Sequence, residues 1–429
     1  MISVGEASAR ILKKIYPLDA ETVPLERAAG RVLAETVVAN TTSPPWDNSS
    51  MDGYAVRSFD LVTARNSSRA SAGAADTARN QLKVVATIAA GQHALRPLGA
   101  GEAMRIMTGA PIPLGADTVI RIEDTDRGVD RVSVTDLRDL GRNIRRAGED
   151  FTNGQTLFDP GTEIRAGHLG AFAAARVREV SVYRKPRVAI LSSGDELVEL
   201  RDYSPSDSPA KIISANSWTL RELITDSGGE AVDLGIAVDT PASLRAKLDL
   251  TQVERFDLII TSAGVSVGDL DHMRSVFAEM GGELDFWKVR MRPGAPMAFG
   301  TLKGIPWLGF SGNPVSAMVS FEVFGRPVIR KMAGHEKLHR ELISVRLAEP
   351  VDIATPLTHF LRATVARNDD GGYVARLAGS QSSAALTAMA RANALLVIPP
   401  DRASNAVGSV VHALPLTDEL GMTSSFSIQ

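Results

Sequence analysis

The chain has 429 residues, which is too long for one ordinary hydrophobic core, so we expect two to four domains. Hydrophobic residues make up 44% and charged residues 23% of the sequence, as is typical of a globular protein. The formal net charge of −3 gives no general attraction to nucleic acid or to an anionic membrane. The sequence has no cysteine, which excludes disulfides, thiolate zinc sites and cysteine nucleophiles.

The first residues read MISVGEASARILKKIYPL and lack the apolar stretch and the small-residue cleavage site of a secretory signal. Nowhere does the sequence contain an apolar run long enough to predict a transmembrane span. We therefore expect a cytoplasmic protein whose partners include neither a membrane nor a nucleic acid.

The first part of the chain divides into helical and β-rich segments. Apolar residues at helical spacing predict a helix over residues 3–16. Short strand patterns separated by glycine and proline then predict a β-rich domain over residues 21–154. Residues 155–184 return to a mixed pattern, and we expect them to form a linking, partly helical domain together with residues 1–20.

From residue 185 onward, predicted strands alternate with predicted helices. Apolar runs at 187–193, 232–238 and 256–264 are separated by helical patterns, and a longer helix is predicted from about residue 314 to 333. This alternation predicts an α/β domain with a doubly wound parallel sheet over residues 185–336. The β pattern of residues 337–429 predicts a small C-terminal barrel or sandwich, of which we adopt the β-barrel.

Acidic residues follow three of the predicted strands in succession. Asp195 and Glu196 follow the first strand, Asp239 follows the second, and Asp269 and Asp271 follow the third. Ligands of open parallel sheets bind at the carboxyl ends of the strands, and gathered carboxylates suit a hard cation such as Mg²⁺. An acid after a strand is also a common helix N-cap, but three strand ends in a row favour a site.

Two turns offer backbone N–H groups to an anion. The first, in residues 262–269, runs from a strand into a helix, and the second, in residues 310–317, precedes a predicted helix. Each combines free N–H groups with the positive end of a helix dipole. An ordinary structural turn is the alternative for either segment alone. The residues that we expect to contact a substrate or an oxyanion there are Ser262, Gly264, Ser266, Gly268, Gly312 and Asn313.

Three cations lie close together in the segment KVRMRPG, residues 288–294. On a strand, Lys288, Arg290 and Arg292 would share one face, because side chains alternate with a period of two. Like charges on one face repel one another unless water or anions surround them. A solvated edge strand is the alternative, but the adjoining proline–glycine turn favours a phosphate or oxyanion site.

Three turn-rich segments of the N-terminal region carry many charged and hydrogen-bonding groups. Exposed loops of this composition commonly carry function. For the last of them a salt-bridged surface turn is the alternative. The segments are 43–58 with Asp52, 106–124 with Thr108, and 141–151 with Asp150.

Together these segments resemble the MoeA family, which includes the gephyrin E domain. The similar motifs run in unchanged order from the first helix to near the end of the chain. Each motif is modest alone, whereas the ordered set is specific. The motifs are PPWDNSSMDGYAVR, MTGAPIPLGADTVI, GRNIRRAGED, SSGDELV, SANSWTL, GIAVDT, SAGVSVGD, KVRMRPG, GNPVSAMVSFE, HFLRA and GSQSSAALTAMARANAL.

The resemblance implies an elongated, four-part homodimer in which the N-terminal loops of one subunit face the α/β domain of the other. It implies a transferase that inserts molybdenum into adenylylated molybdopterin, using molybdate and Mg²⁺ and releasing AMP and molybdenum cofactor. A molybdopterin adenylyltransferase is the protein partner that such a substrate implies.

The same resemblance carries functional roles to matching positions of this sequence. Glu196, Asp239 and Asp271 would organise the metal, and Lys288 and Arg292 would neutralise anionic charge. Arg362 and Ser383 occupy the C-terminal oxyanion positions of the family. The implied catalytic positions are Asp52, Thr108, Asp150, Glu196, Asp239, Asp271, Lys288, Arg292 and Pro314.

The sequence departs from the family pattern in the turns of its α/β domain. Arg292 replaces one usual lysine, Ala295 replaces a second, and Ser311 replaces a usual proline. The charge lost at Ala295 leaves open a paralogue that acts with another oxyanion, such as tungstate. A non-catalytic scaffold or carrier of the same fold is a further alternative, against which the retained acids argue. A pterin adenylyltransferase would leave the first 180 residues unexplained.

Overall fold

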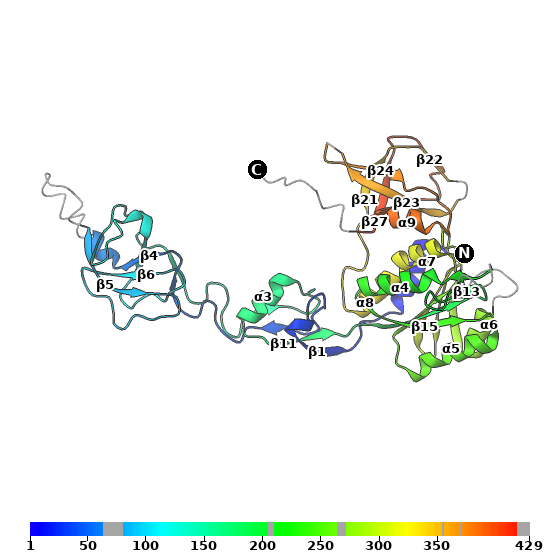
Figure 1. Ribbon diagram of the computed structural model, residues 1–429, viewed down its shortest axis with the longest axis horizontal. Helices are drawn as coiled ribbons and strands as arrows, with labels where there is room; N and C mark the ends of the chain where they lie inside the picture. The colour runs from blue at the N-terminus through cyan, green and yellow to red at the C-terminus, as the bar shows by residue number, and fades with distance from the viewer. Residues whose placement is uncertain (63–79, 205–209, 264–271, 354–355, 369, 418–429) are drawn as a thin grey trace.

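The structure, a computed structural model, describes residues 1–62, 80–204, 210–263, 272–353, 356–368 and 370–417. These residues form four units along an elongated molecule (Figure 1). An α/β domain and a C-terminal β-barrel lie together at one end, a β-rich domain lies at the other, and a smaller unit joins them. In the described parts of the chain, no helix is both long enough and apolar enough to cross a lipid bilayer.

The α/β domain is built on a six-stranded sheet whose central strands are apolar and buried. In order across the sheet the strands are β15 (Glu230–Ala237), β12 (Arg187–Ser193), β16 (Leu258–Ser262), β20 (Ile305–Phe310), β19 (Ala298–Leu302) and β17 (Gly282–Trp287). The first four are parallel, which confirms the predicted sheet, and β19 runs antiparallel to both of its neighbours, β20 and β17. Only Lys303 and Gly304 join β19 to β20, and both have positive φ, as a two-residue hairpin loop requires.

Helices cover both faces of this sheet. One face carries α1 (Val4–Lys13), α4 (Ala215–Asp226), α7 (Pro314–Ser320) and α8 (Arg326–Met332), and the other carries α5 (Pro241–Val253) and α6 (Met273–Glu279). We predicted one continuous helix over residues 314–333, but a π-helical turn, Phe321–Gly325, separates α7 from α8. Pro327 has no N–H to donate within a regular helix, which accounts for the locally wider turn.

Helix α1 packs in the core of the α/β domain. We predicted that residues 1–20 belong with residues 155–184. The structure instead buries Ala7 and Ile11 of α1, and Ile15 just after it, in the same cluster as the central strands of the six-stranded sheet. The physical reason is that the apolar stripe of α1 needs a broad apolar surface, and the short strands of the joining unit offer little of it.

The joining unit is made from two separate stretches of chain. Its strands pair antiparallel, and its core combines residues such as Val23 and Leu33 with Phe151 and Phe172. Residues 20–43 thus pack with the later stretch, so the β-rich domain begins well after the predicted boundary at residue 21. The elements are β1 (Ala20–Pro24), η1 (Leu25–Arg27), β2 (Val37–Val38), β10 (Thr156–Phe158), α3 (Ala166–Ala174) and β11 (Glu179–Tyr183).

The β-rich domain at the far end is a five-stranded sheet with an apolar cluster on each face. A separate pair of two-residue strands, β3 (Asn48–Ser49) and β9 (Ile144–Arg145), closes its base. In order across the sheet the strands are β7 (Thr118–Arg121), β4 (Gly53–Val56), β6 (Glu102–Ile106), β5 (Gln81–Ile88) and β8 (Arg131–Ser133).

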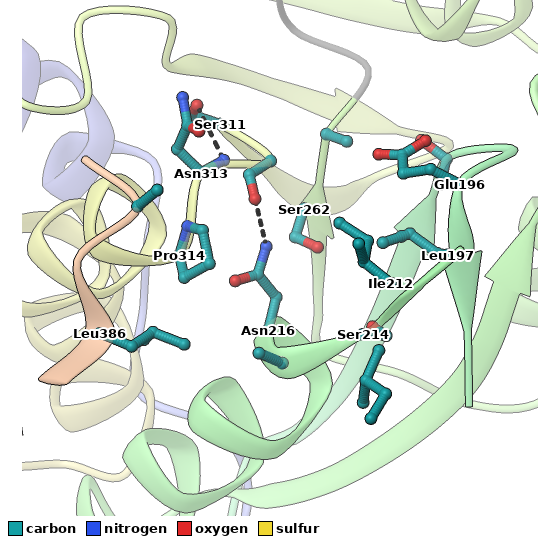
Figure 2. A pocket seen from close by; sticks show the side chains of 16 residues that line it. Glu196, Leu197, Ile212, Ser214, Asn216, Ser262, Ser311, Asn313, Pro314 and Leu386 are labelled. Carbon is teal, nitrogen blue, oxygen red and sulfur yellow. Dashed lines mark hydrogen bonds between the residues drawn. The ribbon is translucent and has the colours of Figure 1, made fainter. Parts of the chain in front are cut away.

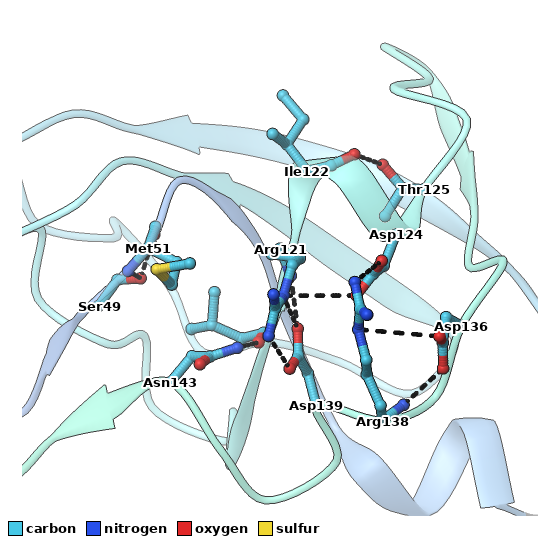
Figure 3. Close-up of polar contacts among 11 residues, drawn as sticks. Ser49, Met51, Arg121, Ile122, Asp124, Thr125, Asp136, Arg138, Asp139 and Asn143 are labelled. Carbon is cyan, nitrogen blue, oxygen red and sulfur yellow. Dashed lines mark hydrogen bonds and ion pairs between the residues drawn. The ribbon is translucent and has the colours of Figure 1, made fainter. Parts of the chain in front are cut away.

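Two arginine–carboxylate pairs fix the loop that follows β7 in this domain (Figure 3). Arg121 donates two hydrogen bonds of 2.9 Å to the buried Asp139 carboxylate, and these bonds lower the pKa of Asp139. Arg138 makes a similar forked contact with Asp124, at 2.7 and 2.5 Å. The neighbouring Ile122 N–H donates to the carbonyl of Asp52, so these pairs brace the turn that carries Asp52.

The C-terminal domain is a closed β-barrel, as predicted. Its ring runs β23–β24–β21–β27–β25 and returns to β23, so each of these strands has two neighbours. Strand β18 (Met291–Arg292) of the α/β domain pairs in parallel with β23 and ties the two domains together. The elements of the barrel are β21 (Ile343–Leu347), β22 (Val351–Asp352), β23 (Thr358–Arg367), β24 (Tyr373–Leu377), α9 (Leu386–Arg391), β25 (Ala394–Ile398), β26 (Ser404–Asn405) and β27 (Val410–Pro415).

Candidate active site

A cavity of about 540 Å³ lies at the carboxyl ends of the parallel strands, where open α/β sheets bind their ligands. It is closed on one side by the parallel pair β13 (Leu197–Val198) and β14 (Ile212–Ile213), and on the other by the starts of α4 and α7. Figure 2 shows Glu196 and Asn313 at opposite sides of this first cavity. Of the residues predicted to bind substrate, it is lined by Glu196, Ser262, Gly312, Asn313 and Pro314.

Three carboxylates gather beside the first cavity. The backbone N–H of Asp239 donates to the carboxylate of Asp195 at 3.0 Å, which joins the ends of β12 and β15. Burial raises the pKa of Asp239, and the negative charges of Asp195 and Glu196 raise it further. Gly194 permits this arrangement, because a Cβ there would lie 2.7 Å from the Glu196 carboxylate. Mutual repulsion of this kind is relieved when a cation binds between the carboxylates.

The predicted magnesium ligands are only partly described. Glu196 and Asp239 stand at neighbouring strand ends as expected, whereas Asp271 lies outside the described residues. Gly264, Ser266 and Gly268, which were predicted to contact an anion, also lie outside them. Among the described residues alone, no set of three acidic or histidine side chains has the geometry of a metal site.

A second cavity, of about 730 Å³, lies between the α/β domain and the barrel. It shares Ser311 and Asn313 with the first cavity, so the two adjoin. Arg292 lies in its wall with no ion-pair partner among the described residues. Its wall is formed by the turn from Met291 to Pro296, by Ser311, Asn313 and Ser316, and by barrel residues that include Asp352, His359, Arg362, Gln381 and Ser383.

Arg362 is the most unusual residue of the second cavity, because its side chain is fully buried. Its Nη2 atom donates to the carbonyls of Ser380 and Ser382, at 2.7 and 3.0 Å. Its Nε and Nη1 atoms have no partner in the described structure. Burial lowers the pKa of the guanidinium. A buried cation with two unused donors is stabilised by an anion that accepts from both.

A single loop of the barrel forms part of both cavities. Gln381 and Ser383 line the second cavity, and Leu386 lines the first. The Gln381 amide holds the backbone of Arg362 through two hydrogen bonds, of 3.0 and 3.1 Å. The carbonyl of Ser383 accepts from the N–H of Val315 in the first turn of α7. The sequence alone gave no sign of this link, apart from its place in the motif GSQSSAAL.

The prediction that Lys288, Arg290 and Arg292 share one face of a strand is wrong. Strand β17 ends at Trp287, and Lys288 has a φ of 79°, which no strand residue adopts. The carbonyl of Arg290 accepts from Thr358 of the barrel, so the segment turns toward that domain. Of the three cations, only Arg292 lines either cavity as formed by the described residues.

The N-terminal candidates lie far from both cavities within one chain. Asp52 accepts hydrogen bonds from the N–H and the hydroxyl of Thr108, at 2.7 and 2.8 Å. These bonds hold the pKa of Asp52 below its usual value. Asp150 is exposed in the joining unit. Figure 1 places the domain of Asp52 at the opposite end of the molecule from the α/β domain.

Sequence reasoning did not single out two polar residues of the first cavity. Asn216 is 7% exposed and donates to the carbonyl of Gly312, while its own carbonyl oxygen has no partner in the described structure. Ser214, the first residue of the motif SANSWTL, precedes α4 and also lines the cavity. The similarity of that motif to the family was the only signal for either residue.

Comparisons with known proteins identify the chain over nearly its whole length. Family models match as the MoeA N-terminal region (domain I and II) over residues 2–175, a probable molybdopterin binding domain over 189–331, and the MoeA C-terminal region (domain IV) over 344–416. These matches confirm the resemblance predicted from the motifs.

Curated relatives and a solved structure give the same result. "Molybdopterin molybdenumtransferase" of Haemophilus influenzae is 32% identical over 98% of this chain and 100% of its own. "Molybdopterin molybdenumtransferase 2" of Mycobacterium tuberculosis is 37% identical over 95% of this chain and 97% of its own. The crystal structure of molybdopterin biosynthesis moeA protein from Pyrococcus horikoshii OT3 superimposes with a TM-score of 0.79 at 28% identity, covering 97% of this chain and 100% of that one.

Proposed function

The chain belongs to the MoeA family, and from that premise we propose that it inserts molybdenum into adenylylated molybdopterin, using molybdate and Mg²⁺ and releasing AMP and molybdenum cofactor. The curated relatives named above are transferases of molybdenum cofactor biosynthesis by their names. A protein that adenylylates molybdopterin would supply the substrate.

The observation that carries this proposal is the pair of adjoining cavities with opposite electrostatic character. The first is lined by Glu196, whose carboxylate lies close enough to Asp239 to raise the pKa of that residue. The second contains Arg292 and the buried Arg362 with its unused donors. A phosphate-bearing substrate beside a cation suits the first, and a small oxyanion such as molybdate suits the second. Their shared wall would bring the two reactants together.

The oxygen ligands that Mg²⁺ prefers are offered at the first cavity by carboxylates. Glu196 and Asp239 would hold it, and the resemblance implies Asp271, which lies outside the described residues, as a third ligand. Bound there, Mg²⁺ would neutralise charge on the phosphoanhydride that is hydrolysed. The residues of the chain would orient the substrate. Ser262 and Asn313, which line the cavity, would donate to its oxygens, and the apolar side chains of Leu197, Ile212 and Leu386 would pack against its rings.

We propose further that two copies of the chain complete each site. Asp52 and Thr108 are exposed and pre-organised by their mutual hydrogen bonds, yet lie at the far end of the chain from Glu196. In an antiparallel homodimer the β-rich domain of one subunit would reach the α/β domain of the other. Lys288 and Asp150 remain predicted members of the site on the basis of the resemblance.

AMP release from adenylylated molybdopterin tests the proposal. Glu196→Gln removes a cavity carboxylate, so we expect release to fall by at least about 100-fold, on the order of the loss for one charge-stabilising group. Glu222→Gln is the matched control, because Glu222 makes the same change on the exposed surface of α4. Near-normal release by Glu196→Gln would overturn the assignment.

The oxyanion part of the proposal has its own experiment. Arg362→Met removes the buried charge while keeping much of the side-chain volume, so molybdate-dependent product formation should be lost although AMP still binds. Titration of the wild type with molybdate and with tungstate identifies the preferred oxyanion. If Arg362→Met keeps the wild-type oxyanion dependence, the second cavity is not the oxyanion site.

A further inference from the structure

Four buried serines stand at the base of the first cavity. Ser192 lies on β12, Ser262 ends β16, and Ser214 and Ser217 lie at the start of α4; none is more than 3% exposed. Hydroxyl groups withdrawn from water in this way must find hydrogen-bond partners in the protein. These four find them largely in one another.

The hydroxyls form a connected chain. The Oγ atom of Ser192 lies 3.1 Å from the Oγ of Ser262 and 3.5 Å from the Oγ of Ser214. Ser217 donates to the carbonyl of Ser214 at 3.1 Å and lies 3.5 Å from its hydroxyl. Ser262 and Ser214 line the cavity, whereas Ser192 does not (Figure 2). Ser192 is thus the link between two hydroxyls that can meet a ligand.

Ser214 is diverted from the role that its position predicts. It is the N-cap residue of α4, and an N-cap serine normally accepts from a backbone N–H in the first turn. Here its side chain makes no capping bond and is directed to the hydroxyl chain instead. The hydroxyl of Ser214 is therefore committed to the other serine hydroxyls and not to the helix.

Each serine hydroxyl has only one proton to donate, and this limits the direction in which the hydrogen bonds between the four serines can run. Ser217 donates its proton to the carbonyl of Ser214. If Ser214 donates to Ser192, then Ser192 donates to Ser262, and the proton of Ser262 is left for a ligand in the cavity. An anionic oxygen selects this direction, and hydroxyls aligned in series strengthen one another.

We propose that Ser192 is a positioning residue that orients the hydroxyl of Ser262 as a donor toward an anionic phosphate oxygen in the first cavity. Ser192 acts through Ser262 and Ser214 and does not touch the ligand. The proposal deepens the proposed function and rests on it, since it takes an adenylylated phosphate ester as the ligand.

Binding of AMP and of adenosine to the full-length protein tests this role. Ser192→Ala interrupts the chain of hydroxyls, so AMP should bind about fivefold more weakly, which corresponds to one hydrogen bond. Adenosine has no phosphate, and its affinity should stay as in the wild type. Ser192→Cys replaces one atom by a slightly larger one and keeps a weak donor, and we expect an intermediate loss for AMP.

Ser227→Ala is the matched control. Like Ser192→Ala, it removes a buried serine hydroxyl. The hydroxyl of Ser227 donates to the carbonyl of Leu223 at 2.6 Å, at the far end of α4, so both affinities should stay unchanged. An equal loss for AMP and adenosine in Ser192→Ala, or no loss for either, would overturn the positioning role alone. A wild-type protein that binds neither ligand would overturn the proposed function and this role with it.

Discussion

Single residues at the first cavity hold charge in an unfavourable arrangement that a ligand would relieve. The carboxylate of Asp239 is partly buried and faces Asp195 and Glu196, and in the described structure none of the three forms an ion pair. Lys211 donates to the backbone carbonyl of Asp195, and the charge of His272 lowers the pKa of Asp239 only in part. Its pKa is raised above the usual value of 3.8. The folded state therefore binds this proton more tightly than the unfolded state does, and stability falls as the pH rises through the interval between the two pKa values.

Asp239→Asn removes this source of pH dependence. Without Mg²⁺, we expect the variant to be more stable than the wild type at pH 7, by a few tenths to about 1 kcal/mol. The difference should vanish as the pH falls below the usual value of 3.8, because Asp239 is then protonated in both the folded and the unfolded state. Urea unfolding followed by tryptophan fluorescence measures this, since Trp218, Trp287 and Trp307 all lie in the α/β domain. If the variant and the wild type are equally stable at pH 7, the repulsion between Asp239 and the neighbouring carboxylates does not affect stability.

At the scale of elements, the turn after β18 is held tightly against helix α7. Gly294 has a φ of 94°, and a Cβ on it would lie 2.6 Å from the hydroxyl oxygen of Ser320. That hydroxyl is buried and has no partner in the described structure. This turn forms one wall of the second cavity, so its position depends on a backbone conformation that few residues other than glycine adopt.

Gly294→Ala should therefore destabilise the α/β domain by about 2 kcal/mol, through backbone strain together with the contact to Ser320. Ser320→Ala in the same chain should recover part of that loss, because it removes the oxygen that the new methyl group meets. Chemical unfolding of the two single variants and the double variant gives the coupling energy. If the two changes in unfolding free energy are strictly additive, the side chains at positions 294 and 320 do not interact.

Sequence patterns predicted best the elements whose own residues show a continuous apolar run. The apolar runs that became β12 and β16 are buried on both faces and could not belong elsewhere. The carboxylates after these strands were predictable for the same reason, because parallel strands end at one edge. Local pattern failed at Lys288, where positive φ breaks a segment that alternates in burial like a strand.

Other features depend on contacts between distant parts of the chain and have no local signature. The hydroxyl of Ser192 meets Ser262 across 70 residues of sequence. Arg362 is buried by the loop that contains Gln381, and only its likeness to a family motif drew attention to it. The domain against which α1 packs could likewise not be predicted, since an amphipathic helix fits any sufficiently broad apolar surface.

At the scale of the whole molecule, the separation of Asp52 from Glu196 predicts complementation between defective copies. Asp52→Asn and Glu196→Gln should each be nearly inactive. Mixed after subunit exchange, they form mixed dimers in which one of the two shared sites is intact, so activity should return to about a quarter of the wild-type value. AMP release by the mixture measures it. A mixture as inactive as its components would place both residues in one subunit's site or outside it.

The order in which the units occur in the chain has a consequence for synthesis on the ribosome. Helix α1 is made before the rest of the α/β domain, yet its buried residues Ala7 and Ile11, and Ile15 just after it, pack against strands and helices that end near residue 330. Two other units are nested between the helix and these partners. At typical translation rates, the apolar stripe of α1 would stay without its partner surface in the α/β domain for on the order of tens of seconds. During this interval we expect the stripe to be a binding site for a chaperone near the exit tunnel, whatever the stability of the finished protein.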